Sequence, residues 1–239
     1  FALLLLNLSL LPEASAREII KVVILRQKSP VTIKGGPFQI SDGSTQVDVQ
    51  TNPLKVSSKD RKLHLHWEKG DAVVRSGARI VSVGLPIQVD RNPYRGEVVL
   101  HSDGGSRILA VNELDLEDYV RGIINHEVSS KWPLEAVKAQ VVAARSYALF
   151  RKAKPKDSRF DVESTVMDQV YRGSSREDEA AAQAVQQTEG LVLTESGGVI
   201  EAYYHSCCGG QTEASGTVWG RERSYLQGVK CGFDQDCPN

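Results

Sequence analysis

The sequence lacks an excess of charge of either sign. Its 239 residues include 29 Lys and Arg and 30 Asp and Glu, which give a formal net charge of −1. Proteins that bind nucleic acid carry a basic patch or stripe, and this chain has none. We therefore expect no nucleic-acid partner. Hydrophobic residues make up 41% and charged residues 25%, which is typical of a globular protein with one large or two modest domains.

Several familiar catalytic motifs are also missing. No cysteine occurs before residue 207 and no G-x-S-x-G segment is present, so a serine or cysteine hydrolase has little support. His126-Glu127 begins like the zinc-binding motif H-E-x-x-H, but Ser130 stands where the second histidine is required. Pro133 would also break a helix running through this region. A zinc protease is excluded on these grounds.

All four cysteines lie near the end of the chain, at positions Cys207, Cys208, Cys231 and Cys237. In an oxidising compartment an even number of cysteines indicates disulfides. A bridge between adjacent cysteines would be strained, so we expect Cys207 and Cys208 to pair with Cys231 and Cys237. The alternative is a zinc ion held by thiolates and His205, although the spacing differs from the usual C-x2-C. Apart from that alternative, we expect no metal and no cofactor.

The sequence has one long apolar run, FALLLLNLSLL at residues 1–11. A membrane-spanning helix needs about 20 residues, so the run is too short to cross a bilayer. Ala14-Ser15-Ala16 follows it as an A-x-A cleavage signal. We expect residues 1–16 to be a signal peptide clipped at its start, and the protein to be secreted to the periplasm, cell envelope or outside. A buried core helix and a retained membrane anchor are the alternatives.

The remaining chain divides by pattern into two parts. Residues 17–90 contain short β-branched runs separated by Gly, Pro and Asp turns, which predict a small N-terminal β module. Residues 63–67 alternate strictly, so His64 and His66 share a face and are expected as outward polar positions rather than metal ligands. Residues 91–239 mix strands and helices, with a long loop after residue 153 and a third helix over 177–190. The predicted fold class is α+β.

The region around Glu127 connects two helical patterns. Asp115 can cap the first helix, and Trp132-Pro133 can open the second, where proline needs no hydrogen-bond partner. A glutamate between two buried helices has its pKa raised by desolvation, which suits a proton donor. On residue type and spacing alone, a structural role is nevertheless favoured, in which Glu127 caps the next helix or pairs with Arg145.

Residues 94–228 resemble the SpoIID/LytB family of stage II sporulation protein D and amidase-enhancer proteins. The blocks that carry the resemblance are Glu127 with Trp132-Pro133, the K-A-Q-x-V-A-A-R block that ends at Arg145, residues 168–173, and Gly209-Gly210-Gln211-Thr212. The chain departs from the family pattern on either side of Glu127. His126 replaces a small apolar residue or proline, and Val128 replaces a methionine. His126 could alter the pH profile, because histidine titrates near neutrality.

The resemblance implies a lytic transglycosylase that cleaves the MurNAc–GlcNAc linkage of denuded peptidoglycan strands and leaves 1,6-anhydro-MurNAc ends. Glu127 would act as the single general acid and base. Two alternatives remain: a non-catalytic wall-binding enhancer of an N-acetylmuramoyl-L-alanine amidase, and a structural envelope protein that binds glycan without cleaving it. The expected partners are glycan strands and a wall amidase or other wall hydrolase.

The candidate substrate-binding residues are Arg145, Asp168, Gln169, Tyr171, Tyr203, Tyr204 and Ser206. Arg145 fits a structural ion pair equally well, Asp168 and Gln169 could instead shape their loop, and the tyrosines could belong to the core.

Overall fold

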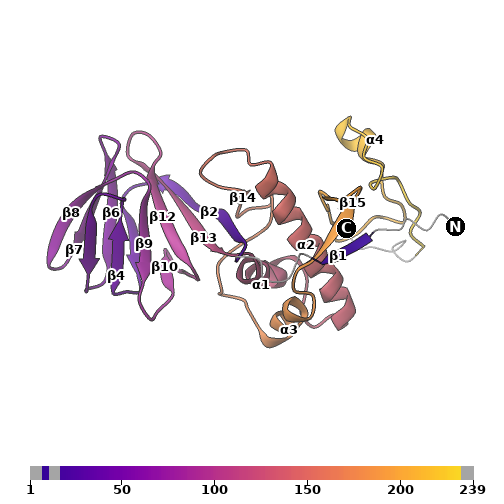
Figure 1. The fold of residues 1–239 in the computed structure, drawn as a ribbon, viewed down its shortest axis with the longest axis horizontal. Helices are drawn as coiled ribbons and strands as arrows, with labels where there is room; N and C mark the ends of the chain where they lie inside the picture. Colours follow the sequence, from indigo (N-terminus) through magenta and orange to yellow (C-terminus); the bar gives the residue numbers. More distant parts are fainter. Residues whose placement is uncertain (1–6, 11–16, 233–239) are drawn as a thin grey trace.

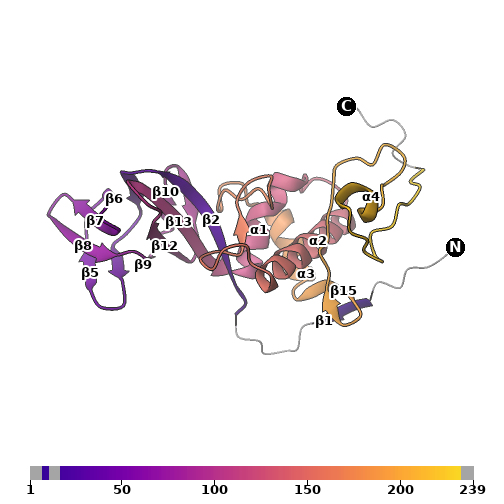
Figure 2. The same ribbon diagram turned by 90° about the horizontal axis from the view of Figure 1, so that it is seen from above.

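The computed structural model describes residues 7–10 and 17–232 and confirms the predicted α+β class. The six- and seven-stranded sheets gather at one end of an elongated molecule, and the helices lie at the other end together with a three-stranded sheet (Figure 1). The view from above gives the same arrangement, with α1 lying between the sheets and the remaining helices (Figure 2). Among the described residues, no helix is both long enough and apolar enough to cross a membrane.

Most of the strands form two sheets. The six-stranded sheet has the order β11-β10-β3-β6-β7-β8. Its strands are β3 (Val31–Lys34), β6 (Leu54–Lys59), β7 (Lys62–Trp67), β8 (Gly70–Arg75), β10 (Ile87–Val89) and β11 (Asn92–Tyr94). The seven-stranded sheet has the order β14-β2-β13-β12-β9-β4-β5. Its strands are β2 (Ile19–Lys28), β4 (Phe38–Ser41), β5 (Gln46–Val49), β9 (Ala78–Ser82), β12 (Glu97–Ser102), β13 (Arg107–Asp115) and β14 (Val162–Glu163).

One hydrophobic core takes side chains from both sheets and from the helices. In β7 the alternation places Leu63 and Leu65 in this core, at 0% and 1% exposure, whereas His64 and His66 lie on the opposite face. That face assignment agrees with the prediction from the sequence.

The seven-stranded sheet crosses the domain boundary predicted between residues 90 and 91. β12 pairs with β9, and β13 pairs along its length with β2 near the start of the described chain. Alternating patterns locate strands along a sequence but do not identify their partners, so the pattern could not reveal this pairing.

Four helices follow the sheets: α1 (Leu116–Glu127), α2 (Leu134–Ala153), α3 (Glu179–Gln187) and α4 (Ser215–Trp219). The Asp115 carboxylate accepts a hydrogen bond from the Glu117 N–H at 2.8 Å, so the predicted cap of α1 is confirmed. Pro133 immediately precedes α2, as expected. The third helix is shorter than predicted, and its cap is Asp178.

A small sheet completes the fold, with β15 (Leu191–Glu195) between β1 (Asn7–Leu10) and β16 (Gly198–Val199). The β-branched and aromatic run at residues 199–204 predicts a second hairpin strand that reaches Tyr204, but β16 ends at Val199. Residues 7–10 are the described part of the predicted signal peptide, and they pair antiparallel with β15. The other residues of that peptide lie outside the described part, so the signal peptide stays a prediction.

Candidate functional site

Glu127 is the last residue of α1, and its side chain is half-buried. Its Oε1 accepts a hydrogen bond from the Val170 backbone N–H at 2.9 Å. Within the described part of the chain, Oε2 accepts none. One carboxylate oxygen is therefore held in place, and the other remains available to a ligand.

The loop that carries Val170 is fixed to the sheet and to α1. The Tyr171 hydroxyl donates to Asn112 Oδ1 at 2.8 Å, and the Asn112 amide donates to the carbonyl oxygens of Arg95 and Glu97. Gly122 of α1 lets the ring approach closely, because a Cβ at this position would lie 2.7 Å from the Tyr171 ring. These contacts set the position of the N–H group that holds Glu127.

Glu127 lines an open groove of about 890 Å³ at the end of α1. Its walls come from the end of α1, the link to α2, α2 itself, the segment before α3 and the segment after β16. The lining residues are Asn125, His126, Glu127, Val128, Ser129, Trp132, Gln140, Arg176, Glu177, Asp178, Tyr204, His205 and Ser206. The groove thus combines a half-buried carboxyl with an exposed aromatic ring, Trp132, and several polar groups.

Burial raises the pKa of Glu127, and this effect exceeds the opposing effect of the Val170 N–H. Two other carboxylates line the groove, and both are engaged elsewhere. Glu177 forms an ion pair with Arg95. Asp178 accepts hydrogen bonds from Ser130 Oγ at 2.6 Å and from the Ala181 N–H at 2.8 Å, and these contacts hold its pKa below the usual range. Glu127 is therefore the groove carboxyl best suited to hold a proton near neutrality.

The raised pKa of Glu127 predicts a pH-dependent stability difference between the parent and a Glu127→Gln variant. Ionisation is less favourable in the folded chain, so the parent loses stability as the pH rises through the folded-state pKa of Glu127. Glutamine has no such charge and can still accept the Val170 N–H. Thermal unfolding should therefore give the variant a melting-temperature advantage at pH 8 that is smaller or absent at pH 4. An equal difference at both pH values would contradict the raised pKa.

Arg145 lies away from the groove, in the core between the helices. Its side chain is 0% exposed, and its Nε and Nη2 donate to the two Glu117 carboxylate oxygens at 2.7 and 2.6 Å. Nη1 donates to the Leu191 carbonyl oxygen at 3.0 Å. These contacts support the structural ion pair over substrate binding by Arg145. The partner in that ion pair is Glu117, not Glu127.

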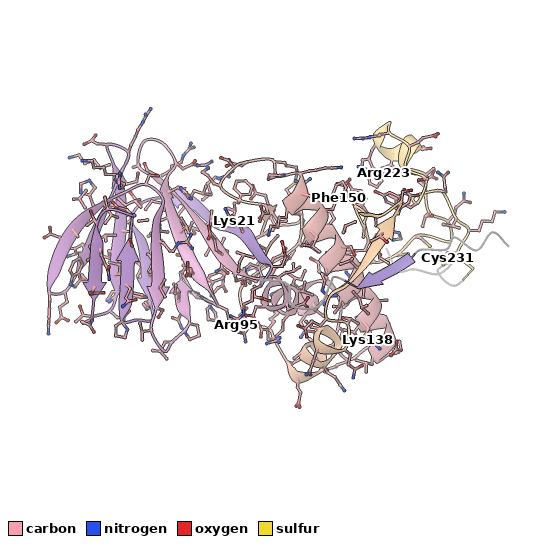
Figure 3. All side chains as sticks on the ribbon, viewed as in Figure 1. Lys21, Arg95, Lys138, Phe150, Arg223 and Cys231 are labelled. Carbon is pink, nitrogen blue, oxygen red and sulfur yellow. The ribbon has the colours of Figure 1, made fainter. Side chains whose placement is uncertain are left out.

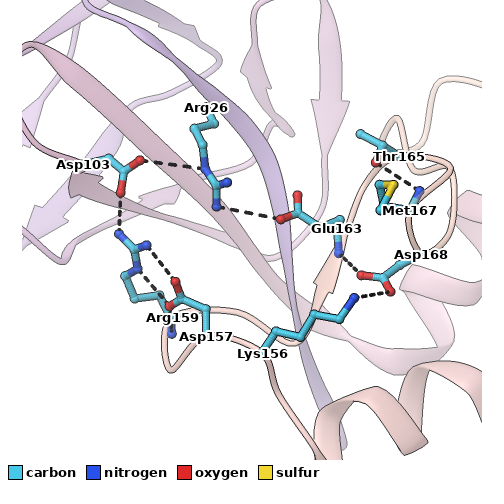
Figure 4. Close-up of polar contacts among 9 residues, drawn as sticks. All are labelled: Arg26, Asp103, Lys156, Asp157, Arg159, Glu163, Thr165, Met167 and Asp168. Atoms are coloured by element: carbon cyan, nitrogen blue, oxygen red, sulfur yellow. Dashed lines mark hydrogen bonds and ion pairs between the residues drawn. The ribbon is translucent and has the colours of Figure 1, made fainter.

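Asp168 anchors the loop that follows β14. One oxygen accepts from the Tyr147 hydroxyl at 2.7 Å, the other from the Glu163 N–H at 2.8 Å, and the side chain is 1% exposed. Figure 4 shows the Glu163 contact together with the Lys156 ammonium, which lies 3.9 Å from Asp168. The carboxylate does not line the groove, and these contacts shape the loop.

Gln169 connects the core to the groove. Its Oε1 accepts from the Tyr119 hydroxyl at 3.1 Å, and its Nε2 donates to the Ala144 carbonyl oxygen at 3.2 Å and to the Tyr204 hydroxyl at 3.1 Å. Gln169 is 1% exposed, whereas Tyr204 lines the groove. Because the Tyr204 oxygen accepts from Gln169, its own proton is free to be donated elsewhere. Gln169 therefore positions a groove residue instead of lining the groove.

Replacing Gln169 with leucine is expected to lower the free energy of unfolding by about 1–3 kcal/mol, because it leaves the buried Tyr119 hydroxyl without its acceptor. Urea denaturation measures this change. Gln183→Leu, at an exposed position of α3, is the matched control and should change stability by less than about 0.5 kcal/mol. A similar small effect at position 169 would show that this network contributes little.

Of the remaining candidate substrate-binding residues, Ser206 lines the groove, whereas Tyr171 and Tyr203 do not. His205 lines the groove as well. Tyr171 is 3% exposed and packs in the core against Tyr94 and Tyr119. Tyr203 is 41% exposed and does not line the groove, and its ring stacks on Trp219 with centroids 4.6 Å apart.

The described cysteines follow β16 in the sequence, and Figure 3 shows Cys231 at the opposite end of the molecule from the six- and seven-stranded sheets. The Cys231 N–H donates to the Gly210 carbonyl oxygen at 2.9 Å, which brings the turn containing Cys207 and Cys208 near residue 231. Cys231 carries a free thiol in the structure, and Cys237 lies outside the described residues. In residues 7–10 and 17–232, no cluster of three or more His, Cys, Asp or Glu could hold a metal ion. The free thiol contradicts the predicted pairing of Cys231, whereas a bridge to Cys237 and the zinc alternative stay predictions.

Two features of the site had no specific signal in the sequence. The group that holds Glu127 is the backbone N–H of Val170, 43 residues along the chain. A backbone donor on a loop leaves no mark in residue type. Arg176 and Asp178 form one wall of the groove, although the pattern around them indicated only the start of a helix.

A family model and several relatives match part of this chain. Residues 104–194 match the family model described as SpoIID, Stage II sporulation protein. An uncharacterized protein of Brachyspira hyodysenteriae is 42% identical over 123 residues, which are 51% of this chain and 33% of that protein. The amidase enhancer of Bacillus subtilis is 41% identical over 107 residues, 45% of this chain and 14% of the enhancer.

Stage II sporulation protein D of Bacillus subtilis is 32% identical over 146 residues, 54% of this chain and 42% of that protein. The chain thus spans less than half the length of each of these relatives. The family match covers α1, α2, α3 and the loop that carries Val170, whereas the groove residues that follow β16 lie beyond it. The resemblance to the SpoIID/LytB family that the sequence predicts is thereby confirmed over residues 104–194.

Proposed function

We propose that this protein is a lytic transglycosylase of peptidoglycan glycan strands, with Glu127 as its single general acid and base. The observation that carries the proposal is the state of Glu127: half-buried in a groove wall, with a raised pKa, one oxygen held by Val170 and the other available. The match to the SpoIID family and the similarity to stage II sporulation protein D support a role in the cell wall, where this reaction would take place.

The proposed reaction uses one carboxyl twice. The protonated Glu127 donates its proton to the glycosidic oxygen between the MurNAc and GlcNAc units, and the bond from that oxygen to the MurNAc anomeric carbon breaks. The resulting carboxylate removes the proton from the 6-hydroxyl of the same MurNAc, whose oxygen attacks the anomeric carbon and closes the 1,6-anhydro ring. Glu127 is thereby protonated again, and no water is consumed.

The neighbouring carboxylates support this reaction over hydrolysis. An ordinary glycosidase needs a second carboxylate as base or nucleophile. In the groove, Glu177 is paired with Arg95, and Asp178 accepts from Ser130 and caps α3. Both are committed to structural contacts, which leaves Glu127 to act alone.

The setting of this reaction is part of the proposal. Peptidoglycan lies outside the cytoplasmic membrane, so the enzyme would be exported to the periplasm or cell envelope. An oxidising compartment would also allow disulfides among the C-terminal cysteines. Glycan strands would be its substrate, and other wall hydrolases would act on the same material.

The second candidate is a non-catalytic enhancer of a wall amidase. It is favoured by one observation, the 41% identity over 107 residues to a protein named amidase enhancer. In that case the groove would bind glycan strands, and the stimulated partner would be an N-acetylmuramoyl-L-alanine amidase.

Product analysis separates the candidates. The purified chain from residue 17 onward is incubated with denuded glycan strands, and the products are identified by mass spectrometry. The transglycosylase proposal expects 1,6-anhydro-muramyl ends from the parent and none from Glu127→Gln. Reducing ends that contain added water would indicate a hydrolase. Strands that bind to both proteins and stay intact would favour the enhancer.

A further inference from the structure

Among the residues that the structure describes, two polar groups that line the groove have no hydrogen-bond partner. They are Nε2 of His126, beside Glu127 on α1, and Nε2 of Gln140 on α2. Both atoms are shielded from solvent and make no hydrogen bond. Buried polar groups are nearly always paired, so an unpaired group at a binding groove points to a ligand that completes it.

Two neighbouring polar side chains, Asn125 and Ser130, are already used within the protein. The Asn125 amide donates to the Arg176 carbonyl oxygen at 2.9 Å, and its Oδ1 accepts the Ser130 N–H at 3.1 Å. The Ser130 hydroxyl donates to Asp178. His126 and Gln140 therefore differ from Asn125 and Ser130 in keeping unused hydrogen-bonding capacity at the groove.

We propose that His126 and Gln140 together bind the 2-acetamido group of a sugar placed next to Glu127, so that N-acetylation determines which glycans the groove accepts. This inference rests on the proposed glycan substrate and specifies the group that the groove recognises.

The two side chains match the hydrogen-bonding pattern of an acetamido group. The Gln140 amide nitrogen is a donor and suits the acetamido carbonyl oxygen. A neutral imidazole can accept through its unprotonated nitrogen and suits the acetamido N–H. Burial and the nearby guanidinium groups of Arg176 and Arg172 lower the pKa of His126, which favours the neutral ring.

The apolar part of the groove suits the methyl of the acetamido group. Val128 and Trp132 line the same groove, and the Trp132 side chain is 54% exposed. The acetamido methyl can pack on such a surface. A hydroxyl at the same ring carbon has no methyl group to bury there, so these contacts favour the acetamido sugar over its 2-hydroxyl counterpart.

The test compares two neutral tetrasaccharides that differ at this position. Chitotetraose carries an acetamido group on every ring, and cellotetraose carries a hydroxyl instead. Binding to the full chain with Glu127→Gln, which blocks cleavage, is measured by calorimetry. We expect chitotetraose to bind at least about tenfold more tightly, as one or two hydrogen bonds and a buried methyl would provide.

Variants then assign the preference to the two residues. In the Glu127→Gln background, adding Gln140→Leu or His126→Phe should weaken chitotetraose binding about three- to tenfold and leave cellotetraose binding unchanged. Gln187→Leu, at an exposed position of α3 outside the groove, is the matched control and should change neither. Gln140→Leu should also keep or raise the melting temperature, because it removes an unpaired buried group, whereas a structural role predicts a lower one.

Three results would overturn the inference: equal binding of the two sugars, a parallel loss of both in the variants, or binding of neither. The proposed reaction is judged separately, because the formation of anhydro ends by the parent does not depend on this comparison. Acetamido-dependent binding without any strand cleavage would support the inference while contradicting the transglycosylase proposal.

Discussion

Replacing Arg145 with methionine is expected to lower the free energy of unfolding by about 3 kcal/mol or more. The arginine is fully buried and joins α1 to β15 through Glu117 and the Leu191 carbonyl. Methionine fills similar space but leaves a carboxylate and a carbonyl oxygen without their donor. The Glu117 side chain is 22% exposed, so water can solvate part of it, and the loss should fall near the lower end of the range for broken buried pairs.

Urea denaturation of four proteins measures this effect as a cycle: the parent, Arg145→Met, Glu117→Leu and the double variant. Glu117→Leu leaves a buried guanidinium unpaired and should be at least as harmful. The double variant should lose much less than the sum of the two single variants, because removing both charges leaves neither uncompensated. Arg121→Met is the matched control. Its side chain is 32% exposed and lies 3.5 Å from Asp118, so we expect a change below about 1 kcal/mol. A loss this small at position 145 would contradict the structural role.

Glu127→Gln is expected to reduce the rate of strand cleavage by about 10²- to 10⁴-fold, the range for removing a general acid and base. Glutamine preserves the shape of the side chain and can still accept a hydrogen bond from the Val170 N–H. It has no acidic proton that it could transfer to a leaving oxygen. The loss should therefore appear in kcat, with strand binding little changed.

Glu189→Gln serves as the matched control for this substitution, because Glu189 is an exposed carboxylate near the end of α3 and outside the groove. It should retain the parent rate. Residual activity of Glu127→Gln within tenfold of the parent would exclude the proposed role and direct attention to Glu177 or Asp178, the other carboxylates of the groove.

The sequence predicted the features of the fold that depend on local chemistry. Asp115 caps α1 and Pro133 precedes α2 because those preferences act within one turn of helix. The alternation in β7 fixed which side chains enter the core. Glu127 was singled out as the carboxyl between two helices, and the structure places it in a groove wall.

Predictions that depended on distant partners were less successful. Ser174 with Glu177 three residues later is a capping-box pattern, which predicts that Ser174 caps the third helix. Instead, the Ser174 N–H donates to the Pro93 carbonyl oxygen at 2.9 Å, which ties this segment to β11, and Asp178 caps α3. The strand expected to reach Tyr204 ends early. Beyond it, Glu201 forms an ion pair with Arg223 and Tyr203 stacks on Trp219.

The candidate substrate-binding residues were also only partly predictable, because their roles depend on distant partners. Tyr204 and Ser206 line the groove, whereas Arg145, Asp168 and Gln169 make contacts inside the protein. Residue type indicates that an arginine or a carboxylate needs a partner. It does not indicate whether that partner is a ligand or a side chain brought near by the fold.

The central claim is that Glu127 acts alone and that water does not attack the sugar. Cleavage of denuded strands in water labelled with the heavy oxygen isotope tests it most directly. The account predicts anhydro-muramyl ends without the label at the earliest times at which products can be measured. New reducing ends that carry the heavy oxygen would contradict it, because they would require water as the nucleophile and a second carboxylate in the groove.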